Sequence, residues 1–186
     1  MRQLRGAYSL CVLTKDSLLG IRDPMGVRPL CIGKLDDGWV IASESCALDH
    51  LGAKYVREIE PGETVVINSK GLQSIPCGVE APRQALCTFE YIYFSRPDSV
   101  MGGPLIYLTR QRMGAQLARE QPADADVVIG VPESALAAAI GYSQESGIPY
   151  SDGLVKNRYV GRTFIQPDQH TRDQQVRLKF LSLIHI

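Results

Sequence analysis

The chain has 186 residues, of which 45% are hydrophobic and 22% are charged, so its composition is that of an ordinary globular protein rather than a disordered or fibrous one. Its 20 Lys and Arg residues balance 20 Asp and Glu residues, which argues against wholesale binding to nucleic acid or to an anionic membrane. No apolar run approaches the roughly 20 residues that a membrane-spanning helix requires.

The first part of the chain predicts short strands of an antiparallel sheet. Apolar and β-branched stretches are separated by turn signals such as DPMG, DDG, EPG and SKG, at a spacing of about ten residues. Between them, SCALDHLG (45–52) predicts a short helix that is capped by Ser45 and ends at Gly52. The predicted strands are AYSLCVLT (7–14), SLLGIRD (17–23), RPLCIGK (28–34), GWVIASES (38–45) and ETVVINS (63–69).

After PCGVEAPRQ (76–84), which has the composition of a linker, the predicted elements alternate. This alternation of strands and helices predicts a parallel sheet with right-handed crossovers, so the fold class is α+β followed by α/β. The elements are a strand at 88–95, a helix at 104–120, a buried strand at 125–131, a helix at 133–146 and a return into a strand at 147–156.

The sequence DVVIGVPESALAAAIG (126–141) predicts a buried strand that runs through a short loop into a helix. The start of such a helix presents unpaired backbone N–H groups, and open α/β sheets bind ligands at this edge. Ser134 adds a hydroxyl that suits a phosphate or a hydrated magnesium ion. A plain helix cap explains the same pattern equally well.

The stretch KNRYVGRTFI (156–165) places aromatic residues among cations, without an apolar stripe of helical or strand period. From Lys156 to Lys179 there are six Lys and Arg residues against two Asp residues. A solvated loop is the ordinary interpretation of such a charge run. A mobile cationic flap that closes over a polyphosphate also accounts for the aromatic side chains, and it suits this sequence better than a nucleic-acid patch does.

Two other groups favour structural roles. The turn DPMG lies between Arg22 and Arg28, which predicts a hairpin turn with an Asp23–Arg28 ion pair. Cys46 and His50 would share one face of the predicted helix, as in a nucleophile pair, but the apolar pattern around Cys46 favours a core cysteine.

The cysteines are five in number, scattered and without a CxxC pair, which favours reduced thiols and a cytoplasmic location. Cys87 has no metal-ligating residues at a fitting spacing, so the local pattern predicts no metal site there. The five are Cys11, Cys31, Cys46, Cys77 and Cys87.

Seven stretches of the chain resemble the glutamine phosphoribosylpyrophosphate amidotransferases, also called amidophosphoribosyltransferases. They occur in the order of that family from about Leu4 to Lys179, and KNRYVGRTFI is the most specific of them. The stretches are RGAYSLCVL, RDPMGVRPL, ASESCALDHLGA, EIEPGE, FEYIYFSRPDS, GVPES and KNRYVGRTFIQP.

The resemblance implies two domains. Family members join a glutaminase of the N-terminal-nucleophile hydrolase fold to a type I phosphoribosyltransferase. Residues 1–78 would be the C-terminal part of the glutaminase sheet, and residues 79–180 an incomplete phosphoribosyltransferase α/β domain. Residues 181–186, LSLIHI, match nothing in the family and are interpreted as an unrelated tail.

The resemblance also implies a reaction. Ammonia from glutamine passes through a channel and displaces pyrophosphate from phosphoribosyl pyrophosphate, giving 5-phosphoribosylamine, the first step of purine (IMP) biosynthesis. The full-length enzyme would be a homo-oligomer, would use Mg²⁺ and, in one subgroup, would hold a [4Fe–4S] cluster. Neither a nucleic acid nor a membrane is an expected partner.

Individual roles carry over onto matching positions. The phosphate side would use Ser134 for magnesium and Lys156 and Arg162 as phosphate partners. Tyr159 would reach towards the glutaminase site. The remaining positions are Phe164 and Ile165 in the ammonia channel and Cys87 as one ligand of the [4Fe–4S] cluster.

The chain also departs from the family pattern. Residue 1 is Met where the family has its catalytic cysteine, so no catalytic residue is assigned. The aspartate pair of the family and the three other cluster cysteines are not found in the sequence. The chain is therefore interpreted as an internal fragment that is inactive alone. The alternative is a non-catalytic module that binds phosphoribosyl pyrophosphate or pairs with a complete subunit.

Overall fold

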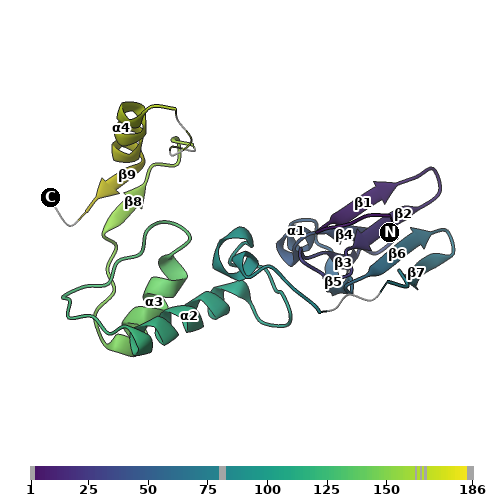
Figure 1. The fold of residues 1–186 in the computed structure, drawn as a ribbon, viewed down its shortest axis with the longest axis horizontal. Coiled ribbons are helices and arrows are strands. Elements are labelled where there is room, and N and C mark those ends of the chain that lie inside the picture. The colour runs from purple at the N-terminus through teal and green to yellow at the C-terminus, as the bar shows by residue number, and fades with distance from the viewer. Residues whose placement is uncertain (1–2, 80–82, 162, 164, 166, 184–186) are drawn as a thin grey trace. The chain divides into compact units, whose positions relative to one another are not determined.

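The computed structural model describes residues 3–79, 83–161, 163, 165 and 167–183. It forms two compact units, Met1–Tyr107 (unit 1) and Leu108–Ile186 (unit 2), each of which is described by itself (Figure 1). The sequence predicted a domain boundary between residues 78 and 79. The boundary between the two compact units lies later in the chain, after Tyr107, because the segment that follows the linker is hydrogen-bonded to the strands and turns before it. For example, the Cys87 N–H donates to the Val27 carbonyl at 3.0 Å.

The strand spacing predicted an antiparallel sheet, and the strands of unit 1 are antiparallel but divide into two sheets. One has the order β1-β2-β6-β7 and the other the order β4-β3-β5. Strands β5 and β7 were not predicted, because KYVRE and GLQSIP lack a continuous apolar or β-branched run. The strands are β1 (Ser9–Leu13), β2 (Leu18–Arg22), β3 (Cys31–Lys34), β4 (Trp39–Ala42), β5 (Lys54–Glu58), β6 (Glu63–Asn68) and β7 (Gly71–Pro76).

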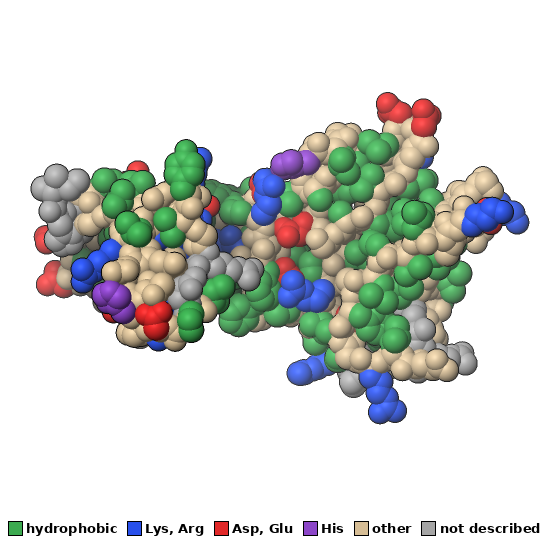
Figure 2. All heavy atoms as spheres, turned by 90° about the horizontal axis from the view of Figure 1, so that it is seen from above, with side chains coloured by type: hydrophobic (Ala, Val, Ile, Leu, Met, Phe, Trp, Pro, Cys, Tyr) green, Lys and Arg blue, Asp and Glu red, His purple; other side chains and the backbone are tan. Residues whose placement is uncertain are grey.

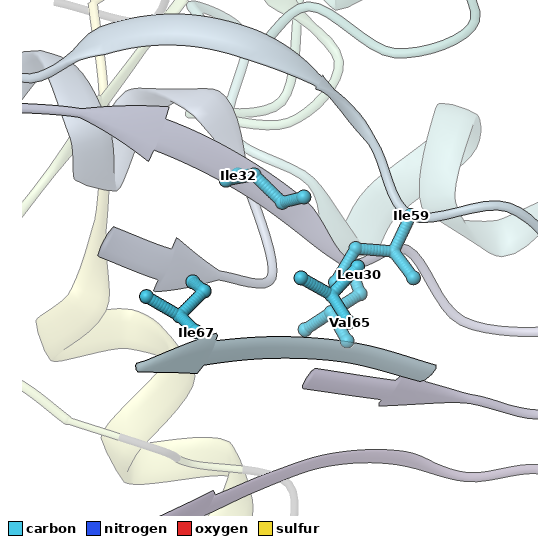
Figure 3. Packing of buried hydrophobic residues seen from close by; sticks show 5 residues of the cluster. All are labelled: Leu30, Ile32, Ile59, Val65 and Ile67. Carbon is cyan, nitrogen blue, oxygen red and sulfur yellow. The ribbon is translucent and has the colours of Figure 1, made fainter. Parts of the chain in front are cut away.

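The core of unit 1 lies between β3 and β6, one strand from each sheet. In β6 every second residue is buried, as expected for a strand with one face towards a core. Figure 3 shows the side chains from the two sheets pointing towards one another. They are Leu30, Ile32, Ile59, Val65 and Ile67, of which Ile32, Ile59 and Val65 are fully buried.

Helix α1 (Ser45–His50) covers a second cluster, in which Leu48 packs with Cys31 and Ala53. The helix is where the sequence predicted it, but Ser45 is not its cap. The N-cap residue is Glu44, and the Ser45 hydroxyl instead accepts a hydrogen bond from the Val100 N–H at 2.8 Å. The predicted cap is therefore wrong, because Ser45 is used in a tertiary contact.

The predicted Asp23–Arg28 ion pair is also wrong. Asp23 is fully buried, and its carboxylate accepts from the backbone N–H groups of Met25 and Val27, each at 3.0 Å. These bonds close the turn on themselves. Arg28 pairs elsewhere, with its Nε 2.8 Å from Glu90 Oε1.

The predicted strand at 88–95 is wrong as well, since Glu90–Phe94 forms a single turn of π-helix (η1). Glu90 is buried, and its carboxylate accepts from the Ser95 hydroxyl at 2.8 Å in addition to its ion pair with Arg28. The Arg28 guanidinium lies 4.6 Å from the centre of the Phe94 ring. A buried carboxylate needs such partners, and the helical turn brings Glu90 and Ser95 together where a strand would separate them.

Unit 2 contains most of α2 (Ile106–Glu120), α3 (Leu136–Ser146), β8 (Leu154–Lys156), α4 (Gln169–Lys179) and β9 (Phe180–Ser182). Helices α2 and α3 were predicted, and α3 ends on Gly147 in the left-handed conformation, with φ of 76°. The predicted strand at 125–131 is reduced to one parallel bridge, between Val128 and Tyr150. Residues 125–127 and 131 are exposed and only Gly130 is buried, so the prediction of a buried strand here is wrong.

Hydrophobic side chains reach the surface on parts of both units (Figure 2). None of the helices in the described part of the chain combines the length and the apolar character needed to cross a membrane. All five cysteines lie within the described residues and are free thiols.

Candidate functional site: the turn before helix α3 and the stem of the 156–179 segment

The turn that leads into α3 is built by backbone hydrogen bonds. The Ala135 N–H donates to the Val131 carbonyl at 3.3 Å, and the Leu136 N–H donates to the Glu133 carbonyl at 3.4 Å. The N-cap residue, Ala135, provides no side-chain acceptor for the first turn of the helix. The N–H groups that follow Leu136 in the first turn have no acceptor within the helix and none from a capping side chain, so this end of α3 suits an anion.

Two predicted site residues lie in this turn or contact it. Ser134 is exposed, and its hydroxyl makes no hydrogen bond to another described residue. Lys156, the last residue of β8, places its Nζ 3.7 Å from Glu133 Oε2, directly beside Ser134 in the chain. The structure therefore brings the loop of Ser134 and the first cation of KNRYVGRTFI to the same place in unit 2.

The segment after Lys156 begins from a fixed stem. Strands β8 and β9 pair antiparallel, with Lys156 opposite Phe180, and the Asn157 N–H donates to the Lys179 carbonyl at 2.7 Å. Lys179 Nζ also donates to the Gly161 carbonyl at 2.9 Å. The predicted flap thus leaves and rejoins the unit at one small antiparallel ladder.

The described flap residues divide into exposed and buried ones. Tyr159 is 99% exposed, and its N–H donates to Asn157 Oδ1 at 3.0 Å, which forms a local Asx turn. Ile165 is also exposed, whereas Thr163 is buried. Two predicted site residues, Arg162 and Phe164, lie outside the described residues.

Helix α4 was not predicted within the flap. Its N-cap is Asp168, whose side chain accepts from the Thr171 N–H at 2.8 Å, and that bond holds the pKa of Asp168 below its usual value. The sequence signal was present as an Asp cap followed by good helix formers. No residue of α4 is buried, so the apolar periodicity that identifies most helices was missing.

In the described residues, Cys87 has no companion metal ligands and the thiol of Cys46 has no histidine base beside it. No three His, Cys, Asp or Glu side chains within the described ranges are grouped closely enough to hold a metal ion, and Cys87 is one ligand only. His50 Nδ1 lies 2.8 Å from the Cys46 carbonyl oxygen rather than from its thiol. Burial raises the pKa of the Cys46 thiol, so the structural interpretation of this pair is confirmed.

The sequence pattern did not single out Glu133 as a member of the site. It was treated only as part of the VPES turn, because nothing in the local pattern connects it with a lysine 23 positions later (156 minus 133). The strand–turn–helix pattern predicted the position of the loop that contains Glu133. Its partner Lys156 is brought to this loop by β8, which only the folded structure shows.

Comparison with known proteins identifies the chain's relatives. The amidophosphoribosyltransferase of Archaeoglobus fulgidus is 52% identical over 176 residues, which are 95% of this chain and 38% of that protein. The enzyme of the same name from Synechocystis is 56% identical, over 94% of this chain and 36% of that protein. The one from Bacillus subtilis is 50% identical, over 96% of this chain and 37% of that protein.

Solved structures are also similar to the chain, in fold and in sequence. Glutamine phosphoribosylpyrophosphate amidotransferase from B. subtilis, complexed with ADP and GMP, has a TM-score of 0.89 and 48% identity, covering 100% of this chain and 40% of that chain. A structure described as the allosteric regulatory enzyme of purine biosynthesis gives the same values. No protein-family model matches the chain.

The chain thus spans well under half the length of the relatives that it matches. The mixed α/β architecture agrees with that of the solved structures, and the identity to the relatives extends along nearly the whole chain. Over the segment that it shares with these proteins, the chain belongs to the amidophosphoribosyltransferase family.

Proposed function

We propose that the chain is the part of an amidophosphoribosyltransferase that binds the pyrophosphate end of phosphoribosyl pyrophosphate. The observation that carries this proposal is the convergence of the uncapped α3 turn, the exposed Ser134 and Lys156 in one unit of a chain related to these enzymes. The complete protein would transfer glutamine-derived ammonia to phosphoribosyl pyrophosphate, release pyrophosphate and form 5-phosphoribosylamine for purine biosynthesis. It would act as a homo-oligomer in a reducing, cytoplasmic compartment, in keeping with the five free thiols.

The proposed chemistry depends on charge stabilisation and exclusion of water. Backbone N–H groups at the start of α3 and the Lys156 ammonium would face the charge that develops on the departing pyrophosphate. The cationic flap, with Tyr159 and Ile165 exposed in this structure, would exclude water so that ammonia is the nucleophile. Tyr159 would extend towards the glutaminase side, and Ile165, with Phe164, would line the ammonia path. Arg162 would be a further phosphate partner.

Magnesium fits this site in a limited way. A single hydroxyl, that of Ser134, cannot hold Mg²⁺ by itself, but it suits an ion that is already bound to phosphate oxygens and waters. When bound, the ion would neutralise charge on the pyrophosphate. A [4Fe–4S] cluster does not fit the described residues, because Cys87 has no companion ligands there. The cluster remains a prediction for a longer protein.

We also propose the finer fold assignment. The two face-to-face antiparallel sheets of unit 1 support a glutaminase of the N-terminal-nucleophile hydrolase fold for residues 1–78. Helices α2 and α3 with the parallel Val128–Tyr150 bridge support a type I phosphoribosyltransferase for 79–180. For the tail 181–186, Leu181 and Ser182 belong to β9 and pair with β8, so the first tail residues complete the stem.

Calorimetry on the whole 186-residue chain tests the proposal. Magnesium with phosphoribosyl pyrophosphate should give binding heat, and Ser134→Ala and Lys156→Ala should each weaken binding about tenfold, the loss of one charge-assisted contact. Ser69→Ala, at an exposed turn residue of unit 1, is the control and should bind like the parent. Heat equal to that of buffer injections, or equal binding by all four proteins, would overturn the proposal.

Activity assays test whether the chain has either enzyme activity by itself. Because the chain spans well under half of its relatives' length, we expect neither glutamine hydrolysis nor ammonia-dependent formation of phosphoribosylamine from it alone. Binding heat without turnover is the result expected of the chain alone under either function, and the observation in favour of a non-catalytic module is that the phosphate-side residues Ser134 and Lys156 are both present and accessible. Turnover in either assay would contradict the expected inactivity.

A further inference from the structure

The proposed function assigns the Lys156 ammonium to a ligand phosphate. In this structure that ammonium is paired with the Glu133 carboxylate instead. The carboxylate oxygen and the ammonium nitrogen are 3.7 Å apart, and the two side chains are 60% and 31% exposed. An ion pair this open to solvent is weak. It is therefore weak enough to be exchanged for a better anion.

Both partners of this ion pair have fixed backbones. Lys156 is held in the β8–β9 ladder opposite Phe180, and the following N–H, that of Asn157, is bonded to Lys179. Glu133 belongs to the turn that is closed by the Ala135–Val131 hydrogen bond. An incoming phosphate therefore competes with the carboxylate for the Lys156 ammonium, and the carboxylate remains near the site after its side chain has rotated away.

We propose that Glu133 is the internal counter-ion of Lys156 and competes with ligand phosphate for it. This inference rests on the proposed function. A carboxylate carries a single charge, whereas a pyrophosphate group carries more charge and more acceptor oxygens, so it is the stronger partner. Glu133 is thus a positioning and selectivity residue. It disfavours the binding of anions with less charge at Lys156 and favours a ligand with a pyrophosphate group.

The test measures binding of magnesium pyrophosphate and of inorganic phosphate by calorimetry at low salt, on the full chain. Glu133→Gln should bind pyrophosphate about three- to fivefold more tightly, because the competing charge is lost. It should also gain more for inorganic phosphate than for pyrophosphate. Glu133→Asp keeps the charge on a shorter side chain and should tighten binding less than Glu133→Gln does.

The matched control is Glu145→Gln, which makes the same change of net charge on α3. Glu145 is paired with Arg119 at 2.8 Å near the other end of that helix, away from the turn, so its loss should leave both affinities unchanged. In a Lys156→Gln background, Glu133→Gln should no longer tighten binding, because the ammonium for which Glu133 and the phosphate compete is absent.

The outcomes are distinguishable. If the parent binds pyrophosphate and Glu133→Gln binds it equally or more weakly, the counter-ion role is overturned while the proposed function stands; weaker binding would assign Glu133 to the metal. If Glu145→Gln tightens binding as much, the effect is one of net charge and the inference also fails. If neither the parent nor Glu133→Gln binds pyrophosphate, the proposed function and this inference fall together.

Discussion

At the scale of single residues, buried carboxylates of unit 1 are held by cations or backbone donors. Glu63, at the start of β6, receives two bonds from the Arg57 guanidinium, at 2.6 and 2.8 Å, and one from the Glu60 N–H at 2.7 Å. Burial alone raises the pKa of Glu63, but these hydrogen bonds and one from Ser74 outweigh it and lower the pKa to about 2. The bonds therefore stabilise the charged carboxylate and join β5 to β6.

Replacing Glu63 with Gln should destabilise the fold by about 2 kcal/mol at neutral pH, because a buried charge-assisted pair is broken. A carboxylate whose pKa is lowered by folding stabilises the native state above its unfolded pKa, and that contribution is lost as the pH falls. The difference between parent and Glu63→Gln should thus shrink as the pH falls from 4.5 towards 2. Urea unfolding followed by circular dichroism across this range measures it.

The control for this prediction is Asp98→Asn, which breaks an equally short ion pair, with Arg96 at 2.7 Å, where both side chains are about half exposed. Exposed pairs contribute about 0–1 kcal/mol, so Asp98→Asn should cost far less than Glu63→Gln. Equal losses from the two variants, or a difference that does not change with pH, would show that burial of Glu63 does not set its contribution.

At the scale of elements, α2 and α3 cross with their backbones in contact. A Cβ atom at Gly114 of α2 would fall on the carbonyl oxygen of Ala138, and one at Gly141 of α3 would fall on the carbonyl oxygen of Gln111. Figure 1 shows the two helices beside each other. Since the clashing atoms are backbone atoms, the helices cannot make room by changing a rotamer.

Gly114→Ala should therefore destabilise unit 2 by about 1–3 kcal/mol, although alanine is the better helix former. Hydrogen exchange of the α2 and α3 amide protons in the parent and in the variant measures this locally. Gly38→Ala is the matched control, because a Cβ atom at Gly38 has no heavy atom within 4 Å. A Gly114→Ala protein with parent-like exchange rates would contradict the close crossing.

At the scale of the whole molecule, strand β1 presents an open edge. It is the terminal strand of its sheet, and Leu10, Val12 and Leu13 are 38%, 40% and 80% exposed. An exposed apolar edge strand without charged residues is a template for pairing with another chain. The isolated protein should therefore self-associate and show poor solubility.

Val12→Lys should reduce this self-association, because a charge on an edge strand opposes pairing. Light scattering over a range of concentrations measures the mean mass of each protein. Leu51→Lys is the control, since Leu51 is 59% exposed but lies just after α1 and not on a strand edge. A parent protein that stays monomeric and melts in one sharp transition would contradict the prediction.

Local patterns in the sequence determined much of this protein. Apolar and β-branched runs between turn residues gave most strands of unit 1, and the alternating elements after the linker gave α2 and α3, because these signals depend on neighbours within a few positions. The motif order gave the family, which the relatives confirm. The site residues were named by resemblance, and their roles stay predictions.

The tertiary structure decided the partners of charged groups. Arg28 pairs with Glu90 rather than with Asp23, Glu90 lies in a helical turn rather than in a strand, and Lys156 meets Glu133 through β8. These pairings join residues that are far apart in the chain. Their energy depends on burial and distance, which no local pattern encodes, so they became visible only when the chain was folded.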